Sequence, residues 1–400
     1  MKILYIHQYF STPQGTGGTR SYWIAQELLK RGHHVTMLTA GKESKRVNVD
    51  GIDVVYVKNP TYSNYQSAPQ KIWVFLSFIR NAIREAKKEN NVDLVFATST
   101  PLTIGYIAMK LKKSKGWHYV FEVRDLWPEF PIQIGAVKNK LAIWYLRRLE
   151  RHIYERSEHV VALSPGMKEG VMKAGTPGEK VSMIPNMSKP DAFFPHEPNM
   201  DIVKEFNIDM SKFNVIHFGS MGRANGLQYI IEAARILKER GDDSIRFVFL
   251  GSGATEPQLR KLSEKYGLTN VAFHGRSPMK TLSEVVNCCQ ASITSFLNLP
   301  ILQTNSPNKL FDSLSAGKPI IVNSAGWTKD MVEQQDCGFF VDPEKPEMLA
   351  DKLLEVKDDQ SLLEEWGENA RKLSVDVYDK SKLSAQVAEV LETTYNKLNR

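Results

Sequence analysis

The chain alternates short apolar runs with amphipathic stretches, and this alternation continues over most of its length. Lys2–Phe10 is a nearly continuous apolar run, which is typical of a strand buried on both faces. The next segment, Ser21–His33, places its apolar residues along one helical face and ends near Gly32. A second apolar run follows at His34–Ala40. This strand–helix–strand order predicts a parallel sheet with right-handed crossovers.

The same pattern recurs on both sides of a proline-rich segment without periodicity, Val181–Pro195, which predicts an interdomain linker. Strands are expected before it at Ile52–Val57, Asp93–Ser99, His118–Val123 and Glu158–Ser164. Strands are expected after it at Phe213–Gly222, Ile245–Gly253, Asn270–Arg276, Ala291–Phe296, Lys318–Gly326 and Gly338–Pro343. We therefore predict an α/β fold with two Rossmann-like domains facing across a cleft, residues 1–188 and 189–377. A helical segment at about 378–400 is expected to pack back on the first domain. Ligands of such sheets bind at the carboxyl ends of the strands.

Composition and charge limit the kinds of partner that this chain is expected to bind. No apolar run approaches the roughly 20 residues that cross a bilayer, and three cysteines make no disulfide framework, which favours the cytoplasm. The net charge of +7 divides into +12 for residues 1–186 and −5 for the rest. A basic half suggests an anionic surface or acceptor. Nucleic acid is the competing partner, but no zinc-finger, RNA-binding or helix-turn-helix pattern is present, so we predict none.

Two helical segments of the basic half combine aromatic and basic residues. These are Lys71–Lys88 and Lys138–Glu158. Such helices suit an anionic membrane interface, although an ordinary domain helix with a solvated face is the alternative for each. The two together predict peripheral association with the inner face of the cell membrane.

Glycines follow several of the predicted strands. Gly17 and Gly18 lie between the first strand and its helix, where backbone N–H groups can approach a phosphate. Gly222 follows the first strand of the second half, and Gly251 and Gly253 follow its neighbour, where backbone must approach a nucleotide. Tight turns are the alternative for each cluster, and the spacing is not that of a dinucleotide fingerprint.

The segment Asn305–Gly326 carries the most specific chemistry. Lys309 is expected in the first turn of a helix, where its charge opposes the helix dipole unless an anion is present. A diphosphate would supply that anion. Asp312, one turn later, can accept hydrogen bonds from both hydroxyls of a ribose. The alternative is a solvated Lys and Asp on an ordinary helix.

Two segments, Asn305–Ile321 and Val123–Glu129, resemble the retaining glycosyltransferases of family 4, which have the GT-B fold. Val123–Glu129 is similar to the bacterial O-antigen and capsule branch, including N-acetyl-L-fucosaminyltransferases. The resemblance covers essentially the whole chain. It implies transfer with retention, by front-face attack, from a UDP-sugar that carries an N-acetylated hexosamine or deoxyhexosamine. The implied acceptor is a polyprenyl-diphosphate-linked saccharide. No pattern of metal ligands is present, so we predict neither metal nor cofactor.

The resemblance assigns roles residue by residue on the donor side. Asp312 matches the acid that binds the ribose, whereas the family's first acid, eight residues earlier, is Thr304 here. Arg223 lies near the family's phosphate-binding arginine, but the expected lysine before Gly226 is Asn225. Lys309 is our candidate to supply that missing charge. Arg276 matches the position beside the uracil, with a surface salt bridge as the alternative.

On the acceptor side, Arg124, Asp125 and Glu129 follow a predicted strand and are placed at the cleft edge. Asp125 is expected to orient or deprotonate the acceptor hydroxyl, and a helix N-cap is the alternative. His7 and His118 are predicted to pack rather than to bind ligands. We predict that catalysis uses Asp125, Arg223 and Lys309. The predicted donor-binding set is Gly17, Gly18, Gly222, Arg223, Gly251, Gly253, Arg276, Asn305, Ser306, Lys309, Leu310 and Asp312. The predicted acceptor-binding set is Arg20, Arg124, Asp125 and Glu129.

Two other functions fit the same fold. A UDP-sugar 2-epimerase would turn over without an acceptor. A non-catalytic protein that binds sugar nucleotides is consistent with the departures at Thr304 and Asn225.

Overall fold

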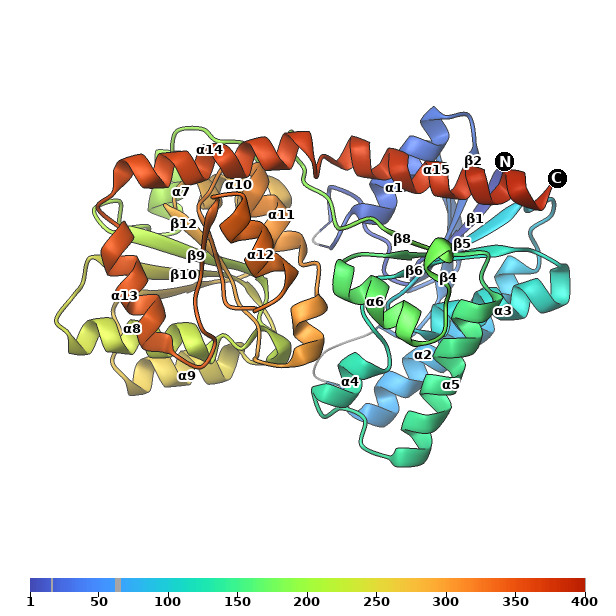
Figure 1. Ribbon diagram of the computed structural model, residues 1–400, viewed down its shortest axis with the longest axis horizontal. Coiled ribbons are helices and arrows are strands. Elements are labelled where there is room, and N and C mark those ends of the chain that lie inside the picture. Colours follow the sequence, from blue (N-terminus) through green and yellow to red (C-terminus); the bar gives the residue numbers. More distant parts are fainter. Residues whose placement is uncertain (16, 62–65, 400) are drawn as a thin grey trace. The chain divides into compact units, whose positions relative to one another are not determined.

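The computed structural model describes residues 1–15, 17–61 and 66–399. The chain divides into two compact units, each built from a sheet flanked by helices (Figure 1). Unit 1 comprises Met1–Pro13, Gly17–Pro185 and the C-terminal segment that starts at Lys380. Unit 2 comprises Asn186–Asp379 and a short stretch that starts at Gln14. The predicted α/β class with two Rossmann-like domains is confirmed.

Unit 1 is organised around an eight-stranded sheet in the order β3-β4-β2-β1-β5-β6-β7-β8. Its strands are β1 (Lys2–Ile6), β2 (His34–Gly41), β3 (Lys45–Val49), β4 (Ile52–Lys58), β5 (Leu94–Thr98), β6 (Tyr119–Val123), β7 (His159–Ala162) and β8 (Val181–Met183). Its helices are α1 (Arg20–Lys30), α2 (Ala68–Ala86), α3 (Thr103–Lys115), α4 (Glu129–Gln133), α5 (Lys140–Arg156), α6 (Pro165–Lys173), the 3-10 turn η1 (Gly178–Lys180) and α15 (Lys380–Leu398). Strand β1 pairs in parallel with both β2 and β5, so it is buried on both faces. That position explains its continuous apolar sequence.

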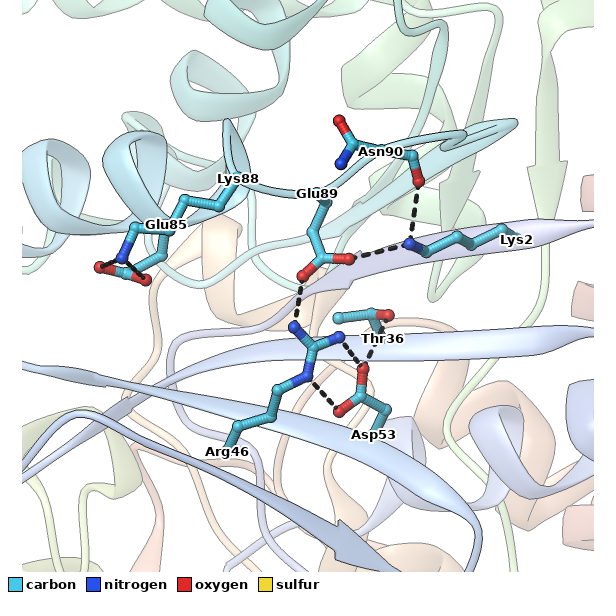
Figure 2. A network of polar contacts seen from close by, with 8 residues as sticks. All are labelled: Lys2, Thr36, Arg46, Asp53, Glu85, Lys88, Glu89 and Asn90. Atoms are coloured by element: carbon cyan, nitrogen blue, oxygen red, sulfur yellow. Dashed lines mark hydrogen bonds and ion pairs between the residues drawn. The ribbon is translucent and has the colours of Figure 1, made fainter.

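The antiparallel hairpin β3–β4 was only half predicted: the sequence indicated its second strand, at Ile52–Val57, but not β3. Its turn is Asp50-Gly51, and both residues have left-handed φ angles, 49° and 87°. An Asp-Gly pair between two apolar-alternating runs is a strong hairpin signal, so this signal was present in the sequence. Figure 2 shows how Arg46 on β3 joins the carboxylates of Asp53 and Glu89. Lys2 also donates to Glu89, at 2.9 Å, so this network ties the hairpin to the start of β1.

The C-terminal helix α15 belongs to unit 1 and packs against α1. Glu392 on α15 accepts from Arg31 at 3.0 Å and from His33 at 2.8 Å, just beyond the end of α1. These polar contacts flank the buried side chains of Leu383, Val387 and Leu391. Apolar burial and ion pairs therefore hold the two ends of the chain together.

Unit 2 contains a fully parallel six-stranded sheet in the order β11-β10-β9-β12-β13-β14. Its strands are β9 (Phe213–Ser220), β10 (Ile245–Ser252), β11 (Val271–His274), β12 (Ala291–Thr294), β13 (Ile320–Val322) and β14 (Gly338–Phe340). Its helical segments are α7 (Met200–Glu205), η2 (Arg223–Asn225), α8 (Gln228–Glu239), α9 (Glu256–Lys265), α10 (Met279–Asn287), η3 (Pro300–Thr304), α11 (Asn308–Ser315), α12 (Trp327–Gln334), α13 (Pro346–Val356) and α14 (Gln360–Asp376). One core cluster packs α8 against β9 and β10.

The segment predicted as a linker, Val181–Pro195, is more ordered than expected. Its first residues form β8, the edge strand of the unit 1 sheet. Its next residues bind α11 of unit 2: the Ser188 hydroxyl donates to the Phe311 carbonyl, and the Lys189 backbone N–H donates to the Ser315 hydroxyl. The boundary between the units therefore lies at residues 185 and 186, because the polar groups that follow pair with α11.

No helix within the described ranges is long and apolar enough to span a membrane.

Candidate active site

In unit 2 the order of strands reverses between β9 and β12, which pair side by side and lead to opposite halves of the sheet. In an open parallel sheet this switch point, at the carboxyl ends of the strands, is where ligands bind. The polar side chains that gather there come from β9, from the turn η2 that follows it, and from α11, which follows β12.

Lys309 is the cation at this switch point. It is the second residue of α11, as the sequence predicted, and its Nζ lies 3.1 Å from Nε2 of His217 and 3.3 Å from Oδ1 of Asn225. Within residues 1–15, 17–61 and 66–399, no carboxylate forms an ion pair with Lys309. Burial lowers the pKa of Lys309 to about 7. Lys309 is therefore only partly protonated near pH 7; neutral acceptors hold it at the end of a helix that favours anions, so a bound diphosphate would favour its ammonium form.

The His217 ring is buried on β9 and is neutral. Burial, and then the charge of Lys309, lower its pKa well below the ordinary value. Because the Lys309 ammonium has only donors, Nε2 of His217 accepts, and the ring proton lies on Nδ1. That nitrogen is 3.2 Å from the Ile293 carbonyl of β12, so the Nδ1–H donates to it. His217 thus joins the two strands of the switch point to Lys309.

Two arginines lie at neighbouring strand ends and are exposed. Arg223 begins η2, the turn that also carries Asn225. Arg276 follows β11, and its Nε donates to the Ser252 hydroxyl at the end of β10, at 2.6 Å. Two guanidinium groups, which follow β9 and β11, therefore lie at the carboxyl edge of this sheet. Lys309 of α11 lies at the same edge.

Asp312 is not the free acceptor that the sequence analysis expected. Its carboxylate pairs with Lys189 at 2.5 Å, and both side chains are almost completely buried. Burial raises the pKa of Asp312, and the charge of Lys189 opposes this shift. A ribose hydroxyl would have to share this carboxylate with Lys189. The ribose role of Asp312 stays a prediction.

Other members of the predicted donor set have structural partners. Leu310 is fully buried in a core cluster, so its prediction as a donor contact is wrong for the side chain. The hydroxyl of Ser306 accepts from the Asn186 backbone N–H at 3.1 Å, and the Asn305 carbonyl accepts from Trp327. Thr304, at the position of the family's first acid, donates to the Ile301 carbonyl.

The sheet itself requires glycine at positions 251 and 253. A Cβ on Gly251 would lie 1.9 Å from the Gly219 carbonyl oxygen, and one on Gly253 would lie 2.4 Å from that of Met221. The close approach of the β9 and β10 ends therefore explains why both residues are glycine, and their role as nucleotide contacts stays a prediction. A Cβ on Gly222 would meet only ordinary contacts.

Unit 1 has its own switch point, between β1 and β5. His7 follows β1 there, buried, with Nδ1 2.7 Å from the Ser21 hydroxyl and Nε2 3.3 Å from Nη1 of Arg124. Burial and the charge of Arg124 lower the pKa of His7 well below its usual value. His7 is thus a neutral packing residue that orients Arg124. His118 instead contacts Glu158, at 2.6 Å.

Asp125 lies beside this group and caps no helix. The nearest helix, α4, has Pro128 at its N-cap, so the capping alternative is wrong. The Asp125 carboxylate accepts from the Thr100 hydroxyl at 3.0 Å, and burial raises its pKa. A carboxylate with a raised pKa is a stronger base, which suits an acceptor-side role. Glu129, in contrast, pairs with Arg147 at 2.7 Å.

Arg20 is not available to an acceptor, so its predicted role is wrong. Its guanidinium is 1% exposed and donates to Glu122 at 2.9 Å and to the carbonyls of Ile184 and Pro185. The glycines before it, Gly17 and Gly18, precede α1, and their phosphate role stays a prediction.

His217, Asn186 and Lys189 were not predicted from the sequence. The position of His217 in a buried strand, two residues before a glycine, was a usable signal. The contacts of Asn186 with Ser306 and of Lys189 with Asp312 join residues more than 100 positions apart, and no local pattern predicts them.

Each of the two α/β units thus places polar side chains at the switch point of its sheet, where ligands of such sheets bind. Residues 15–187 match the glycosyl transferase 4-like domain, and residues 199–373 match the glycosyl transferases group 1 family. The chain is therefore a glycosyltransferase with the GT-B fold, and the enzyme class predicted from sequence is confirmed.

Among the proteins that it resembles is the probable glycosyltransferase WbjE of Pseudomonas aeruginosa, 22% identical over 89% of each chain. It also resembles two solved structures. Anabaena HepE, in complex with UDP-glucose, has a TM-score of 0.72 at 16% identity over 98% of this chain and 100% of that one. WaaG, a glycosyltransferase involved in lipopolysaccharide biosynthesis, has a TM-score of 0.70 at 18% identity over 97% and 99%.

Proposed function

We propose that this glycosyltransferase moves a sugar from a UDP-sugar to a polyprenyl-diphosphate-linked saccharide, with retention and without a metal. The sugar is an N-acetylated hexosamine or deoxyhexosamine. The product belongs to a bacterial surface polysaccharide such as O-antigen or capsule. The donor part of this proposal draws on HepE, whose structure holds UDP-glucose. The polysaccharide part draws on the O-antigen-like segment Val123–Glu129 and on the likeness to WaaG.

The observation that carries the proposal is the Lys309 ammonium, which is buried among the neutral acceptors His217 and Asn225. Departure of UDP develops negative charge on the β-phosphate. A cation already in place stabilises this charge more in the transition state than in the ground state. Arg223, on the turn that also holds Asn225, supplies the second cation. Asn225 thus fills the family's lysine position with a side chain that orients Lys309.

The donor site is tested by Lys309→Met and Arg223→Ala. By analogy with other charge-stabilising donors, each should reduce kcat about 10²- to 10³-fold, or about 3 kcal/mol. Lys329→Met and Arg240→Ala are matched controls, because both residues form surface ion pairs in unit 2. Unchanged turnover in both test variants would refute the phosphate assignment. Thermal stabilisation by UDP, but not by GDP or dTDP, would identify the nucleotide.

Apolar side chains exposed on two helices of unit 1 support a lipid-linked acceptor. Trp73 on α2 and Trp144 on α5 are 62% and 61% exposed. Both helices pack on α3. The other large exposed apolar residues of these helices are Ile72, Leu76, Leu141 and Tyr145. Exposed apolar residues at helical spacing, on a basic unit, suit insertion into an anionic leaflet.

A basic groove accompanies the α5 residues. It has a volume of about 560 Å³ and is lined by Lys140, Ile143, Trp144, Arg147, Arg148, Arg151 and His152. Arg148 also stacks over the Trp144 ring at 5.7 Å. Guanidinium groups beside an aromatic anchor suit the phosphates of lipid headgroups.

The membrane part is tested by co-sedimentation with vesicles. Trp73→Ser and Trp144→Ser should each weaken binding to vesicles that contain phosphatidylglycerol, and Met172→Ser, an exposed apolar residue on α6, should not. Equal binding by all variants, or no binding by the wild type, would contradict a peripheral role. Turnover of a UDP-sugar without any acceptor would favour an epimerase instead.

A further inference from the structure

The environment of Lys309 contains an uncharged hydrogen-bond acceptor at a place where a carboxylate would be the ordinary partner. Nε2 of His217 lies 3.1 Å from Nζ of Lys309. The histidine ring cannot turn away without losing its bond from Nδ1 to the Ile293 carbonyl. It also packs against Phe249 of β10, with ring centroids 6.0 Å apart. Groups from β10 and β12 therefore hold the ring in one orientation, with Nε2 facing the lysine.

We propose that His217 is the positioning residue of the donor site: as a neutral acceptor it fixes the Lys309 ammonium without cancelling its charge, so that the full charge meets the diphosphate. This inference rests on the proposed function. A carboxylate at this place would hold Lys309 equally well, but it would neutralise the lysine and repel the diphosphate. An apolar side chain would leave a desolvated ammonium with one acceptor fewer, which favours loss of its proton.

The charged groups around Lys309 are few. His217 faces it from β9, and it stays neutral because burial and the nearby ammonium disfavour a second cation. From η2 come the uncharged Asn225, which contacts it, and the cationic Arg223. On α11 itself the acid is Asp312, which is paired with Lys189. The protonation of Lys309 is therefore governed mainly by its burial and by the number of its acceptors.

Three substitutions of His217 distinguish the effect of side-chain length from the effect of side-chain charge. In His217→Gln the amide oxygen reaches the position of Nε2 and stays neutral. His217→Asn is one carbon shorter, so it can bond to Ile293 but cannot reach Lys309. His217→Glu has the same reach as Gln but carries a negative charge. UDP affinity is measured by calorimetry at pH 6 and pH 8.5 for each variant.

We expect the Gln variant to bind UDP within about threefold of wild type at both pH values. The Asn variant should bind at least tenfold more weakly at pH 8.5 and lose less at pH 6, where Lys309 keeps its proton. The Glu variant should bind at least a hundredfold more weakly at both pH values. His196→Gln is the control, because the polar contacts of this unit 2 side chain are with the Glu197 carbonyl and with Glu284, away from Lys309.

The result that overturns the inference is equal UDP affinity and equal pH dependence in the Gln, Asn and Glu variants. If the Asn and Glu variants do not fold, a Gln variant that loses tenfold in affinity overturns it as well. Failure of the proposed function looks different: wild type and Lys309→Met would then bind UDP equally well, or neither would bind it. If Lys309→Met loses UDP affinity while all His217 variants keep it, only the proposed role of His217 is refuted.

Discussion

The buried ion pair of Arg20 and Glu122 offers a stringent test of how unit 1 is held together. Both side chains are 1% exposed, and Nε of Arg20 lies 2.9 Å from Oε1 of Glu122. The other carboxylate oxygen of Glu122 accepts from the Thr98 hydroxyl. The remaining guanidinium donors bind the carbonyls of Ile184 and Pro185, the last residues of unit 1 before the chain enters unit 2. Arg20→Met removes all of these bonds and leaves Glu122 buried without its counter-ion.

We expect Arg20→Met to lower the free energy of unfolding strongly, because the buried Glu122 carboxylate is left without a counter-ion. Removing one partner of a buried ion pair costs about 3–5 kcal/mol, and each buried carbonyl left without a donor adds about 1–3 kcal/mol. For a unit of this size, 1 kcal/mol shifts Tm by about 2–4 °C, so scanning calorimetry should show a decrease of about 10 °C or more. Arg46→Ala is the matched control. Its ion pairs with Asp53 and Glu89 involve a guanidinium that is 55% exposed, and exposed pairs contribute about 0–1 kcal/mol.

The double variant Arg20→Met/Glu122→Gln separates charge from packing. Because it removes the uncompensated carboxylate, it should recover a large part of the lost Tm. The reasoning is refuted if Arg20→Met unfolds within about 1 °C of wild type, or if the double variant is no more stable than the single one.

Three further predictions concern single residues. Gly251→Ala should destabilise unit 2 by about 3 kcal/mol or prevent its folding, since the new Cβ would meet the Gly219 carbonyl at 1.9 Å. Gly241→Ala, with a left-handed φ of 74° but open space, should cost only about 1 kcal/mol in urea denaturation; equal losses would contradict the steric argument. Burial raises the pKa of Glu150 to about 8, above its unfolded value, so the folded state keeps a proton that the unfolded state releases, and stability falls as pH rises from about 5 to 8. Glu150→Gln should remove this part of the pH dependence of Tm, and an unaltered profile would refute it. Asp125→Asn should lower the transfer rate while UDP affinity stays near wild type; a lost UDP site would contradict an acceptor role.

Much of the fold followed from patterns that are local in sequence. β1 and β9 each pair in parallel with a strand on both sides, and their continuous apolar runs predict burial on both faces. Helix α11 begins near Lys309 because Pro307, just before its first residue, has no N–H to donate. A helix start and a basic residue in its first turn are both readable from a few neighbouring positions. That is why the start of α11, the position of Lys309 in its first turn and most of the strands were predictable without tertiary information, whereas the phosphate role of Lys309 stays a prediction.

The departures share one physical cause, which is pairing between residues distant along the chain. Arg20 was predicted to bind the acceptor, but its side chain is buried against Glu122, 102 positions away. Asp312 was predicted to accept hydrogen bonds from a ribose, but its carboxylate forms an ion pair with Lys189. The state of Lys309 likewise depends on His217, which only the packing of β9 beside α11 brings within reach. The sequence by itself determined which residues carry charge and where helices and strands form. Only the tertiary structure decided which charges are compensated, because compensation requires two groups to share a buried space that no local pattern specifies.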